Sequence, residues 1–260
     1  MAASLAREAV GRNPDLILVA GGDGTLNEAI NGIVPSTVPV GIIPLGTANV
    51  LGCELGIGRN VEQAVRAIPK YVPRRVAAGL LRNAEGEERY FLLMAGVGLD
   101  AIIVYSISDS LKAAVGKLAY WIGGFSHLTR RLRQFRTTVN GQTVKCGFTL
   151  ASRVRNYGGD LEIACGANLL ENDFEAVLFR GRNPIRYMVY FTAVVARVLP
   201  RVPGITVERA KRIEFSGAEG QSIYVQVDGE LAGHLPASVE IVPDALTLLV
   251  PPAFGGRLDR

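Results

Sequence analysis

The sequence contains few cysteines, and their spacing excludes two common ways of stabilising a fold. Cys53, Cys146 and Cys165 are the 3 cysteines among 260 residues, and no two of them form a CxxC pair. Structural zinc sites need closely spaced Cys and His ligands, and disulfide scaffolds need many cysteines. We therefore expect a chain that relies on its hydrophobic core and that resides in a reducing cytoplasm.

Long apolar runs and several catalytic motifs are also missing. No run approaches the roughly 18 apolar residues of a membrane-spanning helix, and residues 1–8 do not resemble a secretion signal. The patterns GxxxxGK[ST], GxSxG and HExxH are absent, which excludes P-loop NTPases, nucleophile-elbow hydrolases and zinc peptidases that depend on them. With 48% hydrophobic and 20% charged residues, the composition is that of a globular protein.

Acidic residues are absent from one long segment, residues 110–159. The remainder of the chain has 19 basic and 24 acidic residues, so a net acidic protein contains one strongly basic segment. Such a segment is commonly a solvated face, and its functional interpretation is a surface for an anionic partner. It lacks an aromatic-interleaved nucleic-acid motif, so we expect an anionic membrane surface or a nucleotide, and no nucleic acid. Its cations are Lys112, Lys117, Arg130, Arg131, Arg133, Arg136, Lys145, Arg153 and Arg155.

The first part of the chain alternates strands and helices. Short apolar runs at 16–20 and 38–43 are typical of strands buried on both faces, and each is followed by a glycine-containing turn and a helical pattern. A further helix is expected at 61–68, with Asn60 as its N-cap. This order predicts an α/β nucleotide-binding domain with an open parallel sheet, over residues 1–74.

The rest of the chain predicts a mainly antiparallel β-sandwich domain over residues 75–250, followed by a tail at 251–260. Asn140-Gly141 predicts a type I′ hairpin turn. Two helices are expected to interrupt the strands, at 109–125 and at 184–199. The second is very apolar, which favours a packed helix and, less strongly, a membrane-docking one. Strands are expected at 76–81, 90–95, 135–139, 143–154, 174–179, 205–208, 212–215, 223–227, 239–242 and 246–250.

Two turns could carry chemistry at the carboxyl edge of the parallel sheet. Gly21-Gly-Asp-Gly-Thr25 follows the first strand and opens a helix, where exposed amides and the helix dipole favour an anion. Asp23 among such amides suggests an intervening metal or cation, and its structural interpretation is a helix cap. Residues 45–49 form a second turn after the next strand, and two turns at one edge could hold a nucleotide between them.

Taken together, the motifs GGDGT, PLGTAN at 44–49, GVGLDA at 96–101 and VDGE at 227–230 resemble the catalytic domain of the diacylglycerol kinase and sphingosine kinase superfamily, in its bacterial branch of soluble lipid kinases. The resemblance implies an ATP-dependent kinase that phosphorylates a lipid hydroxyl, diacylglycerol-like in preference to sphingoid, with Mg²⁺ on the phosphates. It implies Asp228 as general base beside Glu230, with Asp23 also in the catalytic set. The implied nucleotide-binding residues are Gly21, Gly22, Asp23, Gly24, Thr25, Asn27, Glu28, Gly46, Thr47 and Asn49.

The sequence departs from the family pattern in two places. An Asp-Asp-Gly that helps to hold a structural Mg²⁺ is replaced by Leu170-Glu-Asn172, which leaves Glu171, Asn168 and Asp173 as candidate ligands. The family's first strand and Asn-Pro loop have no counterpart before residue 16. We therefore expect a truncated sheet with an open edge, a weakened nucleotide site and self-association into a homo-oligomer.

Two other functions are consistent with parts of the sequence. A nucleotide- or lipid-binding regulatory relative without turnover would keep the same motifs. Gly96-x-Gly98-x-x-Ala101 also fits a dinucleotide fingerprint, which would predict an NAD-dependent oxidoreductase, although the acid expected about 20 residues later is missing. Asp228-Gly229 by itself is also a common hairpin turn.

Overall fold

The computed structural model describes residues 1–58, 60–99, 132–157, 161–217 and 222–255. The helix expected at 109–125 lies outside these residues, as do four cations of the acid-free segment, Lys112, Lys117, Arg130 and Arg131. Among the described residues, no helix has the length and apolar character needed to cross a membrane.

The N-terminal region is an α/β layer built on parallel strands, as predicted. β1 (Ile17–Gly21) and β2 (Pro39–Pro44) run parallel, joined by α2 (Asp23–Ile33), and α1 (Ala2–Gly11) packs against α2. β1 pairs with β2 alone among the described strands, and Leu18 is 47% exposed, so the expectation of a strand buried on both faces was wrong for β1. Leu18 and Ala20 lie on one face of β1 and are exposed, so no element among the described residues covers this face.

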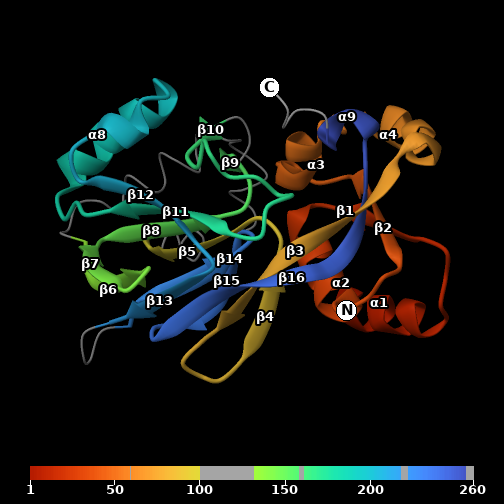
Figure 1. The fold of residues 1–260 in the computed structure, drawn as a ribbon, viewed down its shortest axis with the longest axis horizontal. Helices are drawn as coiled ribbons and strands as arrows, with labels where there is room; N and C mark the ends of the chain where they lie inside the picture. The colour runs from red at the N-terminus through yellow and green to blue at the C-terminus, as the bar shows by residue number, and fades with distance from the viewer. Residues whose placement is uncertain (59, 100–131, 158–160, 218–221, 256–260) are drawn as a thin grey trace.

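Two long strands connect this layer to the β-sandwich. β16 (Ala237–Val250) runs parallel to β2 at one end, and β3 (Val72–Arg82) follows β16 antiparallel over most of its length. Figure 1 shows the two strands side by side between the helices α1–α4 and the sandwich. The pieces expected at 239–242 and 246–250 are therefore one strand, with an irregularity between Val242 and Leu246.

The C-terminal region is an antiparallel sandwich, which confirms the predicted fold class. One sheet contains the strand order β1-β2-β16-β13-β6-β7, with β3 paired to β16 and β4 paired to β3, and the other has the order β12-β11-β8-β5-β14-β15. Aromatic rings fill the space between the sheets; Phe91 and Phe174 stack with ring centroids 5.7 Å apart. The strands are β4 (Glu88–Phe91), β5 (Met94–Gly98), β6 (Phe135–Val139), β7 (Gln142–Cys146), β8 (Phe148–Ser152), β11 (Phe174–Phe179), β12 (Ile205–Ala210), β13 (Arg212–Ser216), β14 (Tyr224–Val227) and β15 (Glu230–His234).

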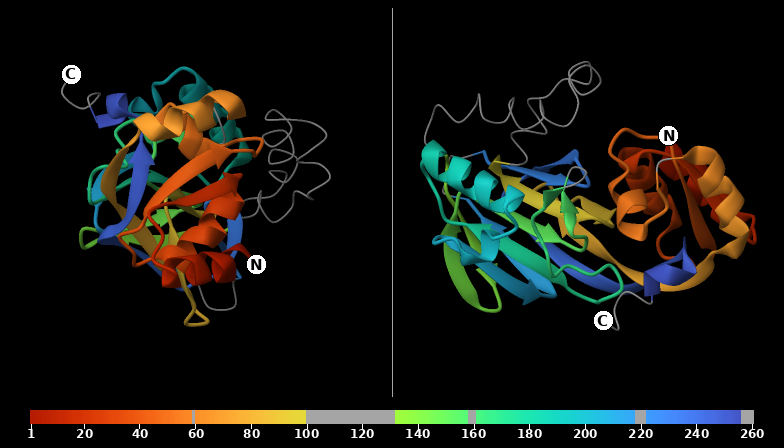
Figure 2. Two further views of the ribbon diagram at one scale, coloured as in Figure 1. Left: turned by 90° about the vertical axis from the view of Figure 1, so that its right-hand side faces the viewer. Right: turned by 90° about the horizontal axis from the view of Figure 1, so that it is seen from above.

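Short elements complete the structure. The Asn60 cap is confirmed, because its side chain accepts a hydrogen bond from the amide of Gln63 at 3.0 Å. The Asn140-Gly141 turn is confirmed by positive φ angles of 49° and 78°. Figure 2 shows α8 lying along the sandwich, at the opposite end of the molecule from α4. The remaining elements are α3 (Val50–Leu55), α4 (Val61–Ala67), η1 (Ile68–Lys70), β9 (Asn156–Tyr157), β10 (Leu161–Glu162), α8 (Pro184–Val195), η3 (Leu199–Arg201) and α9 (Pro252–Gly255).

One predicted strand is divided in a way that matters for the site. The run expected at 90–95 forms the end of β4 in one sheet and the start of β5 in the other. At the break, the amides of Leu92, Leu93 and Met94 turn toward the carboxylate of Asp228 instead of continuing one ladder. The apolar pattern continues through the break, so this pattern does not predict the division.

Candidate functional site

The two glycine-containing turns lie against each other at the carboxyl ends of β1 and β2. The amide of Leu45 donates to the carbonyl of Gly21 at 3.0 Å. A Cβ placed on Gly46 would come within 2.5 Å of the Cα of Gly22, so the backbones meet where no side chain fits. Gly22 also caps α2, whose first amides carry the positive end of the helix dipole. The turns therefore form one rigid edge that exposes a helix N-terminus.

Asp23 connects this edge to the next helix. Its Oδ2 accepts a hydrogen bond from the amide of Val50 at 3.0 Å, and its Oδ1 accepts one from Leu51 at 3.3 Å. Burial raises the pKa of Asp23 above its ordinary value, and the bonds from these two amides oppose that shift. Asp23 therefore satisfies the first amides of α3, a helix other than its own.

The side chain of Asn49 shapes the second turn. Asn49 adopts a left-handed conformation with φ of 47°, its Oδ1 accepts the amide of Gly46 at 2.8 Å, and its Nδ2 donates to the Gly46 carbonyl at 2.6 Å. Thr47 and Thr25 are exposed on the same pair of turns. A Cβ on Gly21 would lie within 2.6–2.8 Å of the Thr25 side chain, so Thr25 covers Gly21 directly.

Asp228 lies in the turn between β14 and β15, with a buried carboxylate. Asp228 and Gly229 have φ of 50° and 85°, the left-handed pair expected of a type I′ turn. The carboxylate accepts four hydrogen bonds of 2.9–3.0 Å, three from the amides of residues 92–94 and one from the Nδ2 of Asn27. Burial raises the pKa of Asp228, and the hydrogen bonds from Leu92, Met94, Asn27 and Leu93 oppose the rise. Asp228 thus connects α2 to the sandwich.

Glu230 is the more accessible carboxylate of this turn, and it meets a residue that the sequence analysis missed. Arg89 on β4 forms an ion pair with Glu230, which is 38% exposed. The same guanidinium donates twice to the Oδ1 of Asn27, at 2.9 Å from Nε and 2.6 Å from Nη2. A Cβ on Gly24 would lie 2.5 Å from the Oε1 of Glu230, so Glu230 reaches the first turn of α2. A lone Arg among the acids of the β3–β4 hairpin was too weak a signal to identify it.

A cleft of about 680 Å³ opens beside these groups, between α2, the β3–β4 hairpin and β15. Asn27, Glu28, Arg89 and Glu230 line it. Glu28 is exposed and accepts the amide of Ala2 at 2.9 Å. The structure therefore brings Asn27, Glu28 and Glu230 together at one cleft, with Asp228 buried behind Asn27 and Gly24 beside Glu230.

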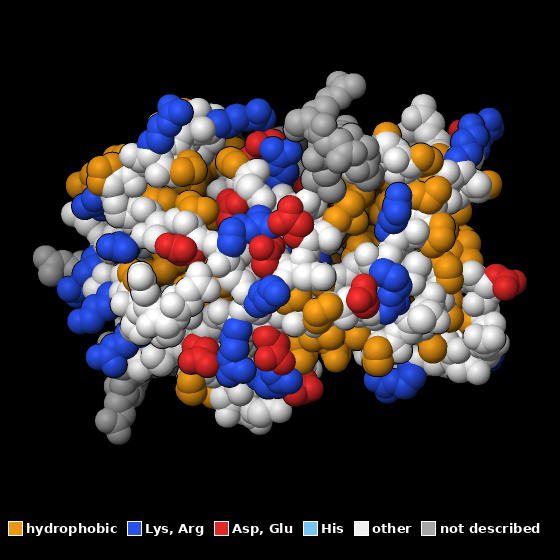
Figure 3. Space-filling model, in the orientation of Figure 1, with side chains coloured by type: hydrophobic (Ala, Val, Ile, Leu, Met, Phe, Trp, Pro, Cys, Tyr) orange, Lys and Arg blue, Asp and Glu red, His pale blue; other side chains and the backbone are white. Residues whose placement is uncertain are grey.

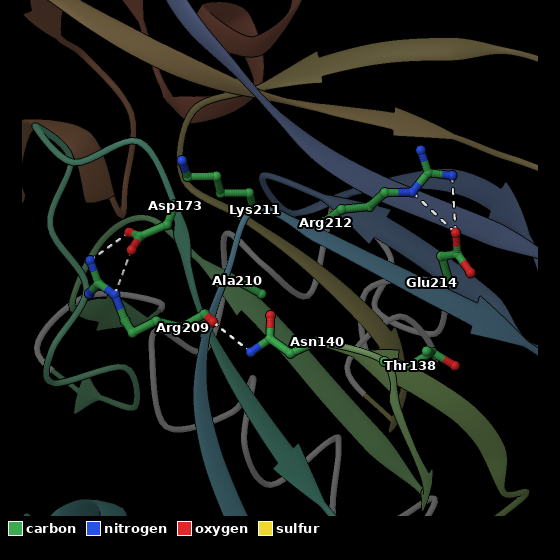
Figure 4. Close-up of a pocket in the computed structure, with 9 residues that line it drawn as sticks. Thr138, Asn140, Asp173, Arg209, Ala210, Lys211, Arg212 and Glu214 are labelled. Atoms are coloured by element: carbon green, nitrogen blue, oxygen red, sulfur yellow. Dashed lines mark hydrogen bonds and ion pairs between the residues drawn. The ribbon is translucent and has the colours of Figure 1, made fainter.

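The candidate metal ligands lie elsewhere, and arginines already occupy them. The Arg209 guanidinium pairs with Asp173 through two bonds, 2.9 Å from Nε and 2.5 Å from Nη2 (Figure 4). The same guanidinium also pairs with Glu171. Asn168 is engaged with Glu171 through a 3.1 Å hydrogen bond. The loop's carbonyls are also taken, because the fully buried Arg153 donates to Leu169 at 2.7 Å and to Glu171 at 3.2 Å.

These groups do not fit a divalent cation, because Arg209 already balances the charge of both carboxylates and Arg153 occupies carbonyl oxygens of the same loop. No group of three or more His, Cys, Asp or Glu suited to a metal occurs among the described residues. Arg153 was also counted among the cations of the acid-free segment. Its burial removes it from any surface that the segment forms.

Comparisons with known proteins agree with this arrangement. The model of the diacylglycerol kinase catalytic domain matches residues 1–81, and that of the YegS C-terminal NAD kinase beta sandwich-like domain matches residues 94–250. A diacylglycerol kinase of Staphylococcus haemolyticus is 30% identical over 241 residues, 90% of this chain and 70% of that protein. The chain belongs to the diacylglycerol kinase family. A further member, the diacylglycerol kinase of Mycobacterium tuberculosis, is 27% identical over 94% of this chain and 79% of its own length.

Solved structures show the same fold as this diacylglycerol kinase family member. A putative diacylglycerol kinase from Bacillus anthracis superposes with a TM-score of 0.79 at 23% identity, covering 97% of this chain and 82% of that one. An NAD kinase from Archaeoglobus fulgidus in complex with ATP superposes with a TM-score of 0.51 at 15% identity, over 95% and 82% of the chains.

The dinucleotide-fingerprint interpretation fails on the position of its glycines. Gly96 and Gly98 lie inside β5, an antiparallel strand paired with β8 and β14, and not in a turn after a parallel strand. We therefore discard the oxidoreductase hypothesis.

Proposed function

We propose that this chain transfers the γ-phosphoryl group of ATP to the hydroxyl of a diacylglycerol-like lipid. The observation that carries the proposal is the meeting of three motifs, since the GGDGT turn adjoins the PLGTAN turn and also reaches Glu230 of the DGE turn. Relatives named diacylglycerol kinase support the lipid substrate. The proposal includes a cytoplasmic enzyme that associates with membranes peripherally.

In this proposal the two turns hold the nucleotide at the sheet edge. The N-terminus of α2 and the glycine amides suit phosphate oxygens, because they supply N–H donors and positive potential without a side chain in the way. Mg²⁺, which neutralises charge on the transferring phosphates, would enter with ATP. Arg89 lines the cleft with a guanidinium 26% exposed, so it can face an anionic group if Glu230 releases it.

Two carboxylates are candidates for the general base that accepts the lipid hydroxyl proton. Asp228 is the candidate that the family resemblance gives, and its raised pKa suits a base that must both accept and release a proton. Its four hydrogen bonds mean that it must exchange one protein donor for the substrate hydroxyl. Glu230 is closer to solvent and pairs with Arg89.

A second candidate function is a nucleotide- or lipid-binding relative without turnover. The observation in its favour is that the Asp228 carboxylate is fully engaged by protein donors. Such a protein would bind ATP at the same edge and leave the lipid unchanged.

A radiolabelled ATP assay on a lipid panel separates the two. We expect phosphate transfer to diacylglycerol, weaker transfer to sphingosine, and thermal stabilisation by ATP with Mg²⁺. ATP binding without transfer to any lipid would favour the non-catalytic relative. Absence of both ATP binding and phosphate transfer would show that the two turns do not form a nucleotide site.

A further inference from the structure

Helix α8 has an apolar face that none of the residues described by the structure covers. Asn183 caps it by accepting the amide of Ile185 at 3.1 Å, and Tyr187 and Tyr190 pack its inner face against Phe179. The outer face is aliphatic and exposed: Ile185 is 69% exposed, Met188 61%, Val189 51% and Val195 58%. Exposed apolar residues gathered at helical spacing commonly mark an interaction surface.

The segment that contains this helix has charges of one sign. Residues 176–207 contain five arginines and no Asp or Glu. Arg197 is paired only loosely, with Glu162 at 3.7 Å. Figure 3 shows apolar side chains in the upper left, where α8 lies, with basic side chains beside them. The arginines are Arg180, Arg182, Arg186, Arg197 and Arg201, all exposed.

The exposed aliphatic face and the neighbouring arginines together favour one kind of binding partner. A second copy of the chain is disfavoured, because a two-fold interface would bring the same arginines face to face. An anionic bilayer matches both properties, since its headgroups attract arginines and its acyl boundary accepts an aliphatic helix face. The 12-residue helix is long enough to lie in that boundary and too short to span a bilayer.

We propose that α8 docks the protein on an anionic membrane, with Ile185, Met188 and Val189 in the headgroup–acyl boundary and its arginines on acidic headgroups. This inference rests on the proposed function, since a lipid kinase must reach a substrate held in a bilayer. Docking itself needs neither ATP nor turnover, so it can be measured separately.

The test is flotation of the full chain with phosphatidylcholine vesicles, with and without phosphatidylglycerol, in the absence of nucleotide and lipid substrate. We expect binding that requires phosphatidylglycerol and weakens with salt. The apolar variant Ile185→Ser/Met188→Ser should weaken partitioning about tenfold or more. The charge variant Arg182→Ala/Arg201→Ala should weaken it about fivefold per arginine, because each basic residue near an anionic surface adds a similar increment.

Matched controls come from exposed residues at the other end of the molecule. Leu5→Ser on α1 and Val65→Ser on α4 also remove exposed aliphatic side chains, and Arg74→Ala removes an exposed arginine of β3. All three should bind vesicles like the wild type, and melting temperatures should show that every variant is folded. Equal binding by the α8 variants and the controls, or no binding by the wild type, would overturn the docking surface.

The outcomes also separate docking from catalysis. Turnover on a detergent-dispersed lipid without vesicle binding would overturn docking and leave the kinase proposal standing. Vesicle binding through α8 without turnover on any lipid would support docking and contradict the kinase.

Discussion

Two groups of carboxylates in this molecule are held by different kinds of hydrogen-bond donor. Asp228, beside α2, receives neutral donors, namely three backbone amides and the amide side chain of Asn27. Glu171 and Asp173, across the sandwich, receive the guanidinium of Arg209. The negative charge of Asp228 is stabilised by hydrogen bonds but not balanced by a paired cation, so the group can accept a proton. The charges of Glu171 and Asp173 are balanced by the guanidinium of Arg209. The difference separates a group available for chemistry from a group that holds a loop.

The strongest way to test this contrast is to remove the charge of Asp228. Asn fits the left-handed turn position, so Asp228→Asn should leave the hairpin intact. We expect lipid phosphorylation to fall by about 10²–10⁴-fold, the range for loss of a general base, with ATP binding nearly unchanged. Steady-state kinetics and nucleotide titration measure the two effects.

Glu230→Gln is the matched control for Asp228→Asn, because it changes the other carboxylate of the same turn. We expect the smaller loss, concentrated in KM, since Glu230 pairs with Arg89 at the cleft. The reverse order of losses would make Glu230 the base. Full activity of Asp228→Asn would show that Asp228 serves only to form the turn.

For the loop at 169–173, which Arg153 and Arg209 hold, we predict that mutation lowers stability and leaves the chemistry intact. Arg153 is fully buried and donates to the carbonyls of Ala77, Leu169 and Glu171. Burial lowers its pKa to about 10, and Asp228 and Asp173 oppose the shift, so it keeps its charge at pH 7. Arg153→Met would leave these carbonyls without their donor and should lower the free energy of unfolding by roughly 3–5 kcal/mol.

Metal removal tests the same loop without a mutation. Since arginines occupy the place of a cation here, EDTA should leave the melting temperature of the nucleotide-free wild type unchanged. A melting temperature that falls with EDTA would show that a bound metal stabilises the protein.

Arg74→Met, at an exposed arginine of β3, is the control for Arg153→Met and should alter the free energy of unfolding by less than about 0.5 kcal/mol.

The pH dependence of stability provides a test, with a smaller expected effect, of the buried site of Asp228 and its uncharged donors. The raised pKa of Asp228 means that the folded state holds its proton to higher pH than the unfolded state, whose value is near 3.9. This group therefore stabilises the fold below that ordinary value, and the contribution is lost as pH rises through the folded pKa. Urea unfolding across this window should show a flatter profile for Asp228→Asn. The pKa values of Asp23, Glu54 and Glu175 are also raised, so these groups add a pH dependence of the same sign.

Sequence reasoning recovered the fold and the motifs where local pattern decides the structure. The Asn140-Gly141 turn and the Asn60 cap follow from short-range geometry, and the alternation of strand and helix predicted the parallel layer. It failed where distant contacts decide. Nothing near Arg89 indicates that Asn27 and Glu230 face it, because these residues are 62 and 141 positions away. The burial of Arg153 likewise depends on carbonyls from two distant segments, Ala77 in β3 and the loop at 169–171.

Asp23 is a third carboxylate, and its mutation tests whether it has a structural role or a catalytic one. Sequence reasoning expected it to act through Mg²⁺, whereas its oxygens accept the amides of Val50 and Leu51 at the start of α3. Asn can also cap a helix, so Asp23→Asn should cost about 1 kcal/mol or less in stability. If Asp23 only positions the second turn against the first, ATP affinity should fall a few-fold with kcat nearly unchanged. If it acts on the phosphates through the metal, kcat should fall by about 10²-fold or more, the scale of one lost electrostatic group. Measuring kcat and ATP affinity for Asp23→Asn and Asp23→Ser together decides between them, because Ser keeps a capping oxygen and cannot carry the charge.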